Sequence, residues 1–187
     1  MGMLRAAVVA FAVAGAAGSD VCPGSDAFIH AWSEVTVAFA STSCAAVATE
    51  IKARISGSAS GSWTDPHNGG TYAVTSSSSS GLVGSRTTKN GQYTDKFGFS
   101  FSTVGAGCEV KGCSQSQVTS IADFSTNYCN LHDLYCGSQD GCTPAGSDYA
   151  YSETDVDTSI GASSDKSACL GGSRKTFLRV GAAVAEA

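Results

Sequence analysis

The feature that most constrains this chain is a set of eight cysteines in 187 residues. Six of them fall between positions 108 and 169, and the full set is Cys22, Cys44, Cys108, Cys113, Cys129, Cys136, Cys142 and Cys169. An even number of cysteines in an oxidising compartment is typical of a disulfide framework. A zinc site prefers cysteine pairs two to four residues apart with histidines nearby, and the three histidines here are scattered. We therefore predict structural disulfides and no metal site, with the pairing left open.

The first 18 residues have the pattern of a secretory signal peptide. Arg5 supplies a positive charge, residues 6–14 form an apolar stretch, and small residues follow it. A membrane span needs about 20 apolar residues, so this stretch is too short to stay in the bilayer. We expect cleavage after Ala16, Ala17 or Gly18, secretion to the extracellular space, and no stable membrane span afterwards.

Charge and length narrow the remaining possibilities. The chain has 11 Lys and Arg against 16 Asp and Glu, a formal net charge of −5. Proteins that bind phosphate backbones usually carry basic surfaces, so we expect no nucleic-acid partner. The length suits one domain. We divide the chain into a signal peptide over 1–18, a single disulfide-rich domain over 19–170 and a C-terminal tail over 171–187, which ends in a short helix or frays.

The spacing of apolar residues predicts a long helix that begins near Phe28. Seven of them share one face of a 3.6-residue period: Phe28, Trp32, Val35, Phe39, Val47, Ile51 and Ile55. Ser25 or Asp26 can cap the start, and Gly57 can end the helix. The triplet at 41–43 is a point where it can bend.

Between residues 63 and 118 the period changes to two. The segments 71–75, 82–88 and 96–102 alternate large with small or apolar with polar residues, as half-buried antiparallel strands do. Turn-forming residues separate them, including Asn90-Gly91 and the serine run before Gly81. We predict a β-meander whose inner face bears Phe97, Phe99 and Phe101 and packs against Trp32 and Phe39 of the helix.

The region after Cys113 supports two interpretations. Residues 117–135 have the stripe of a helix, whereas 118–129 alternate as a strand does, and we favour the strand because Thr, Tyr and Phe suit pleated surfaces. Residues 137–161 are rich in glycine, serine and acids, which predicts a surface loop. A long helix packed on an antiparallel meander and stapled by disulfides is an α+β fold, and this order resembles cystatin-like architectures. The hairpin motif of inhibitory cystatins is absent, so the resemblance extends to architecture alone.

Two longer strings resemble a group of secreted, cysteine-rich proteins of marine microalgae. They are Trp63-x-Asp65-Pro66-His67-Asn68-x-Gly70-Thr71-Tyr72 and Ser125-Thr126-Asn127-Tyr128-Cys129-Asn130-x-x-x-Leu134-Tyr135-Cys136. The resemblance covers roughly residues 44–169. It implies secretion and a shared fold, and it implies no mechanism.

The sharpest chemical motif is Cys129-x-x-His132-Asp133-x-x-Cys136. It resembles the cysteine-flanked His-Asp pair of secreted phospholipases A2, where the histidine activates water and the aspartate binds calcium. The likeness is partial because the cysteine spacing differs and residues 114–127 contain no glycine to form a calcium loop. Ca²⁺ takes six to eight oxygen ligands. We therefore favour the interpretation that His132 and Asp133 are a surface pair in a turn or helix over the interpretation that they are catalytic.

Two further groups are candidates for binding. His67, flanked by Trp63 and Tyr72, can stack on a sugar or a peptide, although a turn-forming role explains the same residues. The acids Asp148, Glu153, Asp155 and Asp157 can gather a weak calcium site, although they are spread along a loop and a solvated surface is the favoured interpretation.

Three functional hypotheses follow from these residues. The first is a secreted binding or inhibitory module for an extracellular protein or glycan, without a cofactor. The second is a small calcium-dependent lipolytic hydrolase that uses His132 and Asp133. The third is a structural component of an extracellular coat.

Overall fold

The computed structural model describes residues 21–171. The predicted signal peptide and nearly all of the predicted tail lie outside these residues. Six strands, three α-helices and one 3-10 helix follow in the order β1 (Trp32–Phe39), α1 (Cys44–Ser60), β2 (Thr71–Ser77), β3 (Gly81–Thr87), β4 (Thr94–Val104), β5 (Gly107–Ser116), α2 (Thr126–Tyr135), η1 (Ser138–Asp140), β6 (Ser152–Thr158) and α3 (Lys166–Cys169).

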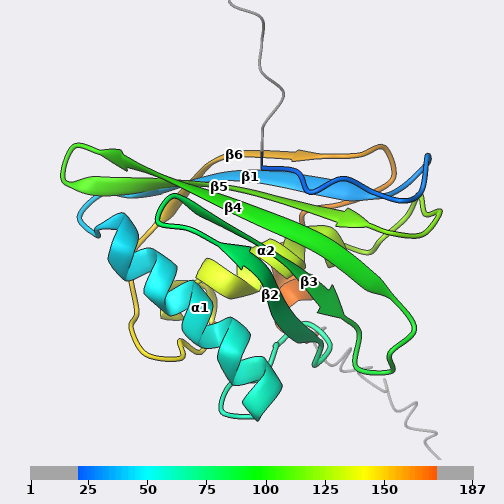
Figure 1. Cartoon of the computed structure of the whole chain (residues 1–187), viewed down its shortest axis with the longest axis horizontal. Helices are drawn as coiled ribbons and strands as arrows, with labels where there is room; N and C mark the ends of the chain where they lie inside the picture. The colour runs from blue at the N-terminus through cyan, green and yellow to red at the C-terminus, as the bar shows by residue number, and fades with distance from the viewer. Residues whose placement is uncertain (1–20, 172–187) are drawn as a thin grey trace, which may run out of the picture.

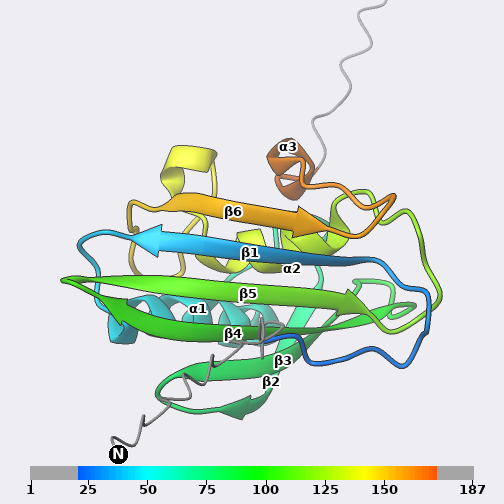
Figure 2. The same cartoon turned by 90° about the horizontal axis from the view of Figure 1, so that it is seen from above.

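The strands form one antiparallel sheet with the order β2-β3-β4-β5-β1-β6. Helices α1 and α2 cover the same face of this sheet (Figure 1). The segment before β1 crosses the opposite face (Figure 2). Gly98 permits that crossing, because a Cβ atom there would lie 2.2 Å from the carbonyl oxygen of Val21. The predicted α+β class and the predicted meander of β2 to β5 are therefore confirmed.

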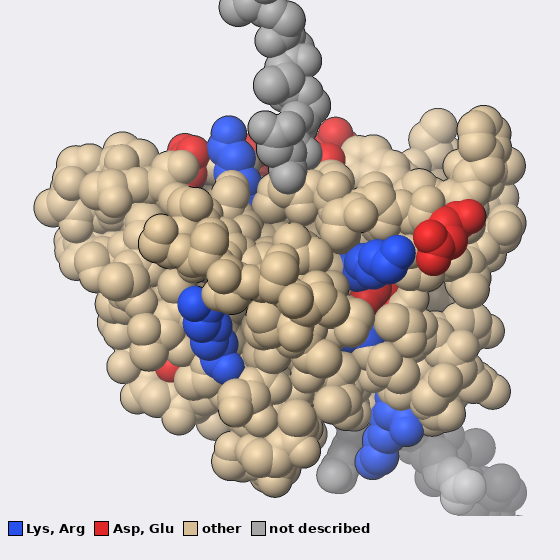
Figure 3. All heavy atoms as spheres, in the orientation of Figure 1, with Lys and Arg blue, Asp and Glu red and all other residues tan. Residues whose placement is uncertain are grey.

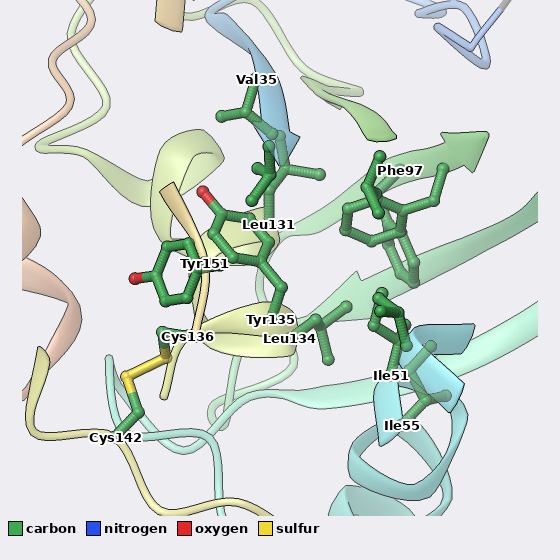
Figure 4. Packing of buried hydrophobic residues seen from close by; sticks show 14 of the residues in the cluster. Val35, Ile51, Ile55, Phe97, Leu131, Leu134, Tyr135, Cys136, Cys142 and Tyr151 are labelled. Carbon is green, nitrogen blue, oxygen red and sulfur yellow. A yellow bond between two sulfur atoms is a disulfide. The ribbon is translucent and has the colours of Figure 1, made fainter. Parts of the chain in front are cut away.

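The core lies between the sheet and the two helices. Alternating residues of β4 point inward, and Phe97, Phe99 and Phe101 are at most 6% exposed. Ile51 and Ile55 of α1 lie opposite Phe97 (Figure 4). The period of two in 96–102 thus predicted the inner face of the sheet correctly.

The predicted helix from residue 28 is wrong in its first half, because residues 32–39 form strand β1. Val35, Val37 and Phe39 are buried at every second position, and the strand pairs with β5 and β6 on its two sides. β-branched residues favour such a position, and the helical spacing of the apolar residues was a coincidence. Trp32 and Phe39 are seven positions apart, so in a strand they face opposite sides of the sheet.

The helix that does form begins at Cys44. The Ser43 side chain accepts a hydrogen bond from the amide of Ala46, which caps the first turn. The helix continues past the predicted end at Gly57 and stops at Gly61, which has a φ of 80°. The predicted bend at 41–43 is the connection between strand and helix.

The preference for a strand over 118–129 is also wrong, because residues 126–135 form helix α2. Nine of its ten residues are buried, which is why it shows both an apolar stripe and an apparent alternation. A helix enclosed on nearly all sides shows no single polar face, so periodicity alone cannot identify it.

The predicted surface loop over 137–161 contains strand β6, which the sequence did not predict, while residues 145–148 are exposed as predicted. Glu50 of α1 accepts hydrogen bonds from the amides of Ala145, Gly146 and Ser147 at 2.7 to 2.9 Å. A buried carboxylate therefore fixes this exposed glycine- and serine-rich segment.

All eight cysteines are paired, which confirms the disulfide framework. The pairs are Cys22–Cys113, Cys44–Cys108, Cys129–Cys169 and Cys136–Cys142. The first ties the N-terminal segment to β5, the second ties α1 to the same strand, and the third ties α2 to α3. Bonds that close long loops contribute most to stability.

Candidate functional site

Two buried asparagines join α2 to one half of the sheet. Asn130 Nδ2 donates a hydrogen bond to Asp95 Oδ2 of β4 at 2.8 Å. Asn127 Nδ2 donates to Asp123 Oδ2 at 3.1 Å and to Ser116 Oγ of β5 at 3.0 Å. Both asparagines are 0% exposed, so these amides hold two carboxylates, Asp95 and Asp123, in fixed positions.

Both carboxylates line one cavity of about 460 Å³. Burial raises the pKa of Asp95, and the charge of Asp123 raises it further, while hydrogen bonds from Asn130 and Ser116 oppose the rise. The Asp123 carboxylate also accepts the amides of Ser125 and Asn127 at 3.1 and 3.0 Å. The cavity therefore contains two acids at its wall, both positioned before any ligand arrives.

The rim of this acid-lined cavity is apolar and exposed. Tyr93, Val118 and Phe124 line it and are 53%, 44% and 83% exposed. Phe124 and Ser125 have φ angles of 51° and 68°, which non-glycine residues rarely adopt. The Ser125 hydroxyl holds this conformation through bonds to Ser163 Oγ at 2.7 Å and from the Asp165 amide at 3.1 Å.

A second cavity of about 610 Å³ adjoins the first, and Ser120 lines both. Its exposed apolar residues are Phe28, Ile29, Ile121 and Ile160. These residues belong to the segment before β1 and to the β5–α2 and β6–α3 connections, which lie at the same end of the sheet, on the right in Figures 1 and 2. We call this surface the loop end and define it by seven exposed residues: Phe28, Ile29, Tyr93, Val118, Ile121, Phe124 and Ile160.

The loop end contains most of the exposed apolar side chains in residues 21–171. Within residues 21–171, ten large apolar residues are exposed, and seven of these ten belong to the loop end. In the space-filling view the right-hand side of the molecule is mainly uncharged, with basic and acidic side chains lying together near its middle (Figure 3). Contiguous apolar surface of this kind is typical of binding sites.

His132 lies at a different place, between α2 and β6, where it is 1% exposed. Its Nδ1 lies 3.0 Å from Glu153 Oε1, which also accepts the hydroxyls of Tyr128 at 2.8 Å and Tyr135 at 2.7 Å. Burial alone would raise the pKa of Glu153, but these hydrogen bonds outweigh it and lower the pKa to about 2. An ionised carboxylate only accepts hydrogen bonds, so His132 Nδ1 carries a proton.

The His132 ring is enclosed by aromatic side chains. It stacks on Tyr128 with centroids 5.2 Å apart and meets Tyr135 edge to face at 5.3 Å. Lys166 Nζ of α3 lies 3.3 Å from the other oxygen of Glu153. This cluster joins α2, β6 and α3, and its burial leaves the ring no open path to a substrate.

Asp133 points away from His132, towards the buried ion pair of Asp65 and Arg86. Arg86 Nε donates to Asp65 Oδ2 at 3.1 Å. Burial raises the pKa of Asp133 to about 10, and the nearby charge of Asp65 contributes to the rise. The carboxyl is therefore protonated at neutral pH. The two neighbours in the sequence motif do not converge, and a protonated acid is a poor ligand for calcium.

The aromatic residues predicted to flank a recognition site belong to the core. Trp63 is 6% and Tyr72 is 1% exposed, and the Trp63 indole donates to the carbonyl of Thr143 at 2.8 Å. His67 Nδ1 lies 2.8 Å from the carbonyl oxygen of Ala168, and the Asp65 carboxylate accepts the His67 amide at 3.0 Å. These contacts support the turn-forming interpretation rather than exposed recognition.

The four acids of the predicted weak calcium site are dispersed. Glu153 faces the His132 cluster, Asp148 accepts the amide of Ser138 at 3.1 Å, and Asp155 and Asp157 are exposed on β6. The sulfur atoms of Cys136 and Cys142 lie near His132, but they form a disulfide. They are therefore not thiolates.

The sequence did not single out Asp95, Asp123 or the apolar loop residues as parts of a site. One local signal existed, because Asp123, Ser125 and Thr126 are residue types that favour the start of a helix. Isolated large apolar residues in polar connections, such as Ile121 and Ile160, were a second signal. The closeness of Asp95 and Asp123 comes from the packing of α2 on the sheet and has no counterpart in the sequence.

Comparison with protein-family models, with curated proteins and with solved structures finds no match to this chain. Within residues 21–171, no helix has the length and apolar character that crossing a bilayer requires. The resemblances to cystatin-like folds and to the microalgal proteins remain predictions.

Proposed function

We propose that this protein is a secreted, disulfide-stabilised binding module that takes its ligand at the loop end. The observation that supports this proposal most strongly is the concentration of exposed apolar side chains there, around two adjoining cavities. Exposing such residues to water is unfavourable, and contiguous apolar patches usually mark interaction sites. Four disulfides suit a domain that works in an oxidising, extracellular setting.

The two other hypotheses receive less support from the geometry. A lipolytic hydrolase needs a histidine that reaches substrate, whereas His132 is buried among tyrosines and Asp133 faces another cluster. A coat component needs two complementary surfaces to polymerise. The described residues gather their exposed apolar side chains mainly at one end.

Screening the oxidised, full-length protein against a phage-displayed peptide library and a glycan array tests the proposal. We expect selected peptides or glycans to bind the wild-type protein and to lose binding to the double variant Ile121→Ser/Phe124→Ser. Both side chains are exposed, at 62% and 83%, so their replacement should leave folding intact.

Val104→Ser is the matched control. Val104 is 60% exposed and lies at the opposite end of the sheet, so its replacement should leave binding unchanged. Ligands that bind the double variant as tightly as the wild-type protein would overturn the loop end as the binding site. Calcium-stimulated hydrolysis of phospholipid micelles that His132→Ala abolishes would overturn the binding module itself.

A further inference from the structure

We propose that the loop end binds a polypeptide segment of another protein in which a basic side chain neighbours one or more aliphatic ones. The Lys or Arg side chain enters the cavity lined by Asp95 and Asp123, and the aliphatic side chains occupy the adjoining cavity. This inference rests on the proposed function and names the chemistry of the partner.

The charges of the two cavities favour a cation. The acids that line them are Asp95 and Asp123 in one and Asp157 in the other, and among the described residues no Lys or Arg lines either cavity. Lys89 and Lys96 belong to the β3–β4 hairpin, which also carries Asp95, but they line neither cavity. His30 lines the second cavity, with its Nδ1 lying 2.8 Å from the Ala27 carbonyl oxygen and its Nε2 3.4 Å from Gln115 Nε2.

Asp95 and Asp123 both line the first cavity, and the charge of Asp123 disfavours an ionised Asp95. Burial is the main reason that the pKa of Asp95 is raised, and the charge of Asp123 adds to it. The charge of Arg86 opposes this rise, but its Nε donates to Asp65, which is 2% exposed. A Lys or Arg side chain in the cavity would relieve the repulsion and form charge-assisted hydrogen bonds with groups already fixed in place.

The rim suits the stem of a long basic side chain. Lys and Arg bury their methylene groups on apolar surface while the charged group reaches polar partners. Phe124 and Tyr93 provide that surface and can also contact the cation through their rings. The aromatic rim therefore favours the long stem of a Lys or Arg side chain, and the acidic wall favours its charged group.

The second cavity favours aliphatic side chains over sugars. Three of its four exposed apolar residues are the aliphatic Ile29, Ile121 and Ile160; the fourth is Phe28, and the partly buried Trp32 also lines the cavity. Sugars bind best on flat aromatic faces with many hydrogen-bond donors nearby, whereas branched aliphatic groups pack well on isoleucine. Since Ser120 lines both cavities, a segment of a few residues can occupy both, and the net charge of −5 attracts a basic partner over longer range.

The test uses a positional-scanning array of immobilised, acetylated hexapeptides and the oxidised, full-length protein. We expect the strongest signals from peptides that contain Arg or Lys within three residues of Ile, Leu or Val. The best peptide is then titrated in solution beside a version in which citrulline, a neutral isostere, replaces arginine. We expect the citrulline peptide to bind at least about 10-fold more weakly, as the loss of a charged hydrogen bond implies.

Asp95→Asn and Asp123→Asn carry the matching change in the protein. Each should weaken binding of the arginine peptide at least about 10-fold and leave binding of the citrulline peptide nearly unchanged. Asp155→Asn is the control, because it removes one exposed acid from β6 that lines neither cavity. Because the comparison of the two peptides needs no mutation, it decides the question even if a variant fails to fold.

The outcomes separate this inference from the function on which it rests. Equal binding of the arginine and citrulline peptides at the loop end overturns the basic partner and keeps the binding module. Binding of glycans alone, with the same dependence on Ile121 and Phe124, does the same. If the loop-end substitutions leave every selected ligand bound, both the inference and the proposed site fail.

Discussion

The two ends of the sheet differ in what their connections contain. At the turn end, defined by residues 40–43 and 105–106, the connections are built from Ala, Ser, Thr and Gly, and a disulfide joins Cys44 to Cys108. At the loop end, the connections carry exposed phenylalanine and isoleucine and a pair of non-glycine residues with positive φ. The turn end has the small residues that suit tight connections between neighbouring elements. The loop end has large apolar residues that such connections do not require.

This difference separates stability from binding. Exposed side chains bury little apolar area on folding and so contribute little to the free energy of unfolding. Phe124 and Ile121 therefore need another explanation, and contact with a ligand provides one. If this comparison is right, substitutions in the core and at the turn end change stability, and substitutions at the loop end change binding.

The largest expected effect on the free energy of unfolding comes from replacing a phenylalanine with alanine, once in the core and once at the loop end. Phe99 is 2% exposed and packs beside Phe97 and Phe101 with ring centroids 6.0 and 6.5 Å away. Phe99→Ala should lower the free energy of unfolding by about 3–5 kcal/mol because it leaves a cavity in the core. Phe124→Ala, at a residue that is 83% exposed, should change it by less than about 0.5 kcal/mol. Urea unfolding, monitored by tryptophan fluorescence, measures both changes in the free energy of unfolding.

A large loss of stability in Phe124→Ala would contradict the division between the two regions. The loop end would then contribute to folding, and its apolar residues would need no ligand to explain them. A small effect of Phe99→Ala would place the inner face of β4 on the wrong side of the sheet.

The next effect concerns the disulfide at the turn end. The bond between Cys44 and Cys108 spans 64 residues, so the double variant Cys44→Ala/Cys108→Ala should lose about 2–4 kcal/mol of unfolding free energy. Because the bond is remote from the loop end, the folded variant should bind the selected peptides as the wild-type protein does. Thermal unfolding and peptide titration at 10 °C measure the two properties. If the double variant lost peptide binding but kept its stability, binding at the loop end would depend on the disulfide at the turn end, and the division between the two ends would be wrong.

The sequence predicted those parts of the fold that depend on local pattern. The strands β2 to β5 alternate clearly, and the cysteines predicted the framework, although not its pairing. Residues 32–39 were assigned to a helix because seven apolar positions fitted its period, while the neighbours that make this segment a strand, β5 and β6, are remote in sequence. Helix α2 was misassigned because it is buried on nearly every side, which removes the contrast that periodicity measures.

The candidate site was less predictable than the fold. The motif at His132 and Asp133 joined two residues that are neighbours in the chain and face different clusters. Asp95 and Asp123 are 28 positions apart in the numbering and line one cavity because α2 packs on the sheet. Chemistry that arises from tertiary contact has no fixed spacing to detect in a single sequence.

A smaller effect concerns the pH dependence of stability at Asp133. Its pKa is raised to about 10 in the folded protein, chiefly by burial, against about 4 in an unfolded chain. Between these values the folded state holds a proton that the unfolded state has lost, so stability falls as pH rises through this window. Asp133→Asn removes this proton uptake and should raise the free energy of unfolding by about 1–2 kcal/mol at pH 8, since the buried amide offsets part of the gain.

Urea unfolding at pH 5, 6.5 and 8 checks this expectation. The stability of the variant relative to the wild-type protein should increase with pH, and the trend should level off below about pH 4, where both states of the wild-type protein become protonated. Asp155→Asn, at an exposed position, should show no such trend. A constant difference across the range would mean that Asp133 is ionised in the folded protein.

The smallest effect tests the backbone at the loop end. Phe124 has a φ of 51°, where a side chain crowds the following carbonyl at a cost of about 1–2 kcal/mol and glycine does not. Glycine also gains freedom in the unfolded chain, which offsets part of the benefit. Phe124→Gly should therefore be more stable than Phe124→Ala by about 0.5–1 kcal/mol, although both remove the same ring. If the two variants are equally stable and both lose binding of the selected peptides, the phenyl ring alone accounts for the function of this position. If Phe124→Gly is the more stable and binds no peptide, the protein keeps a strained residue at the rim for its contact with the ligand.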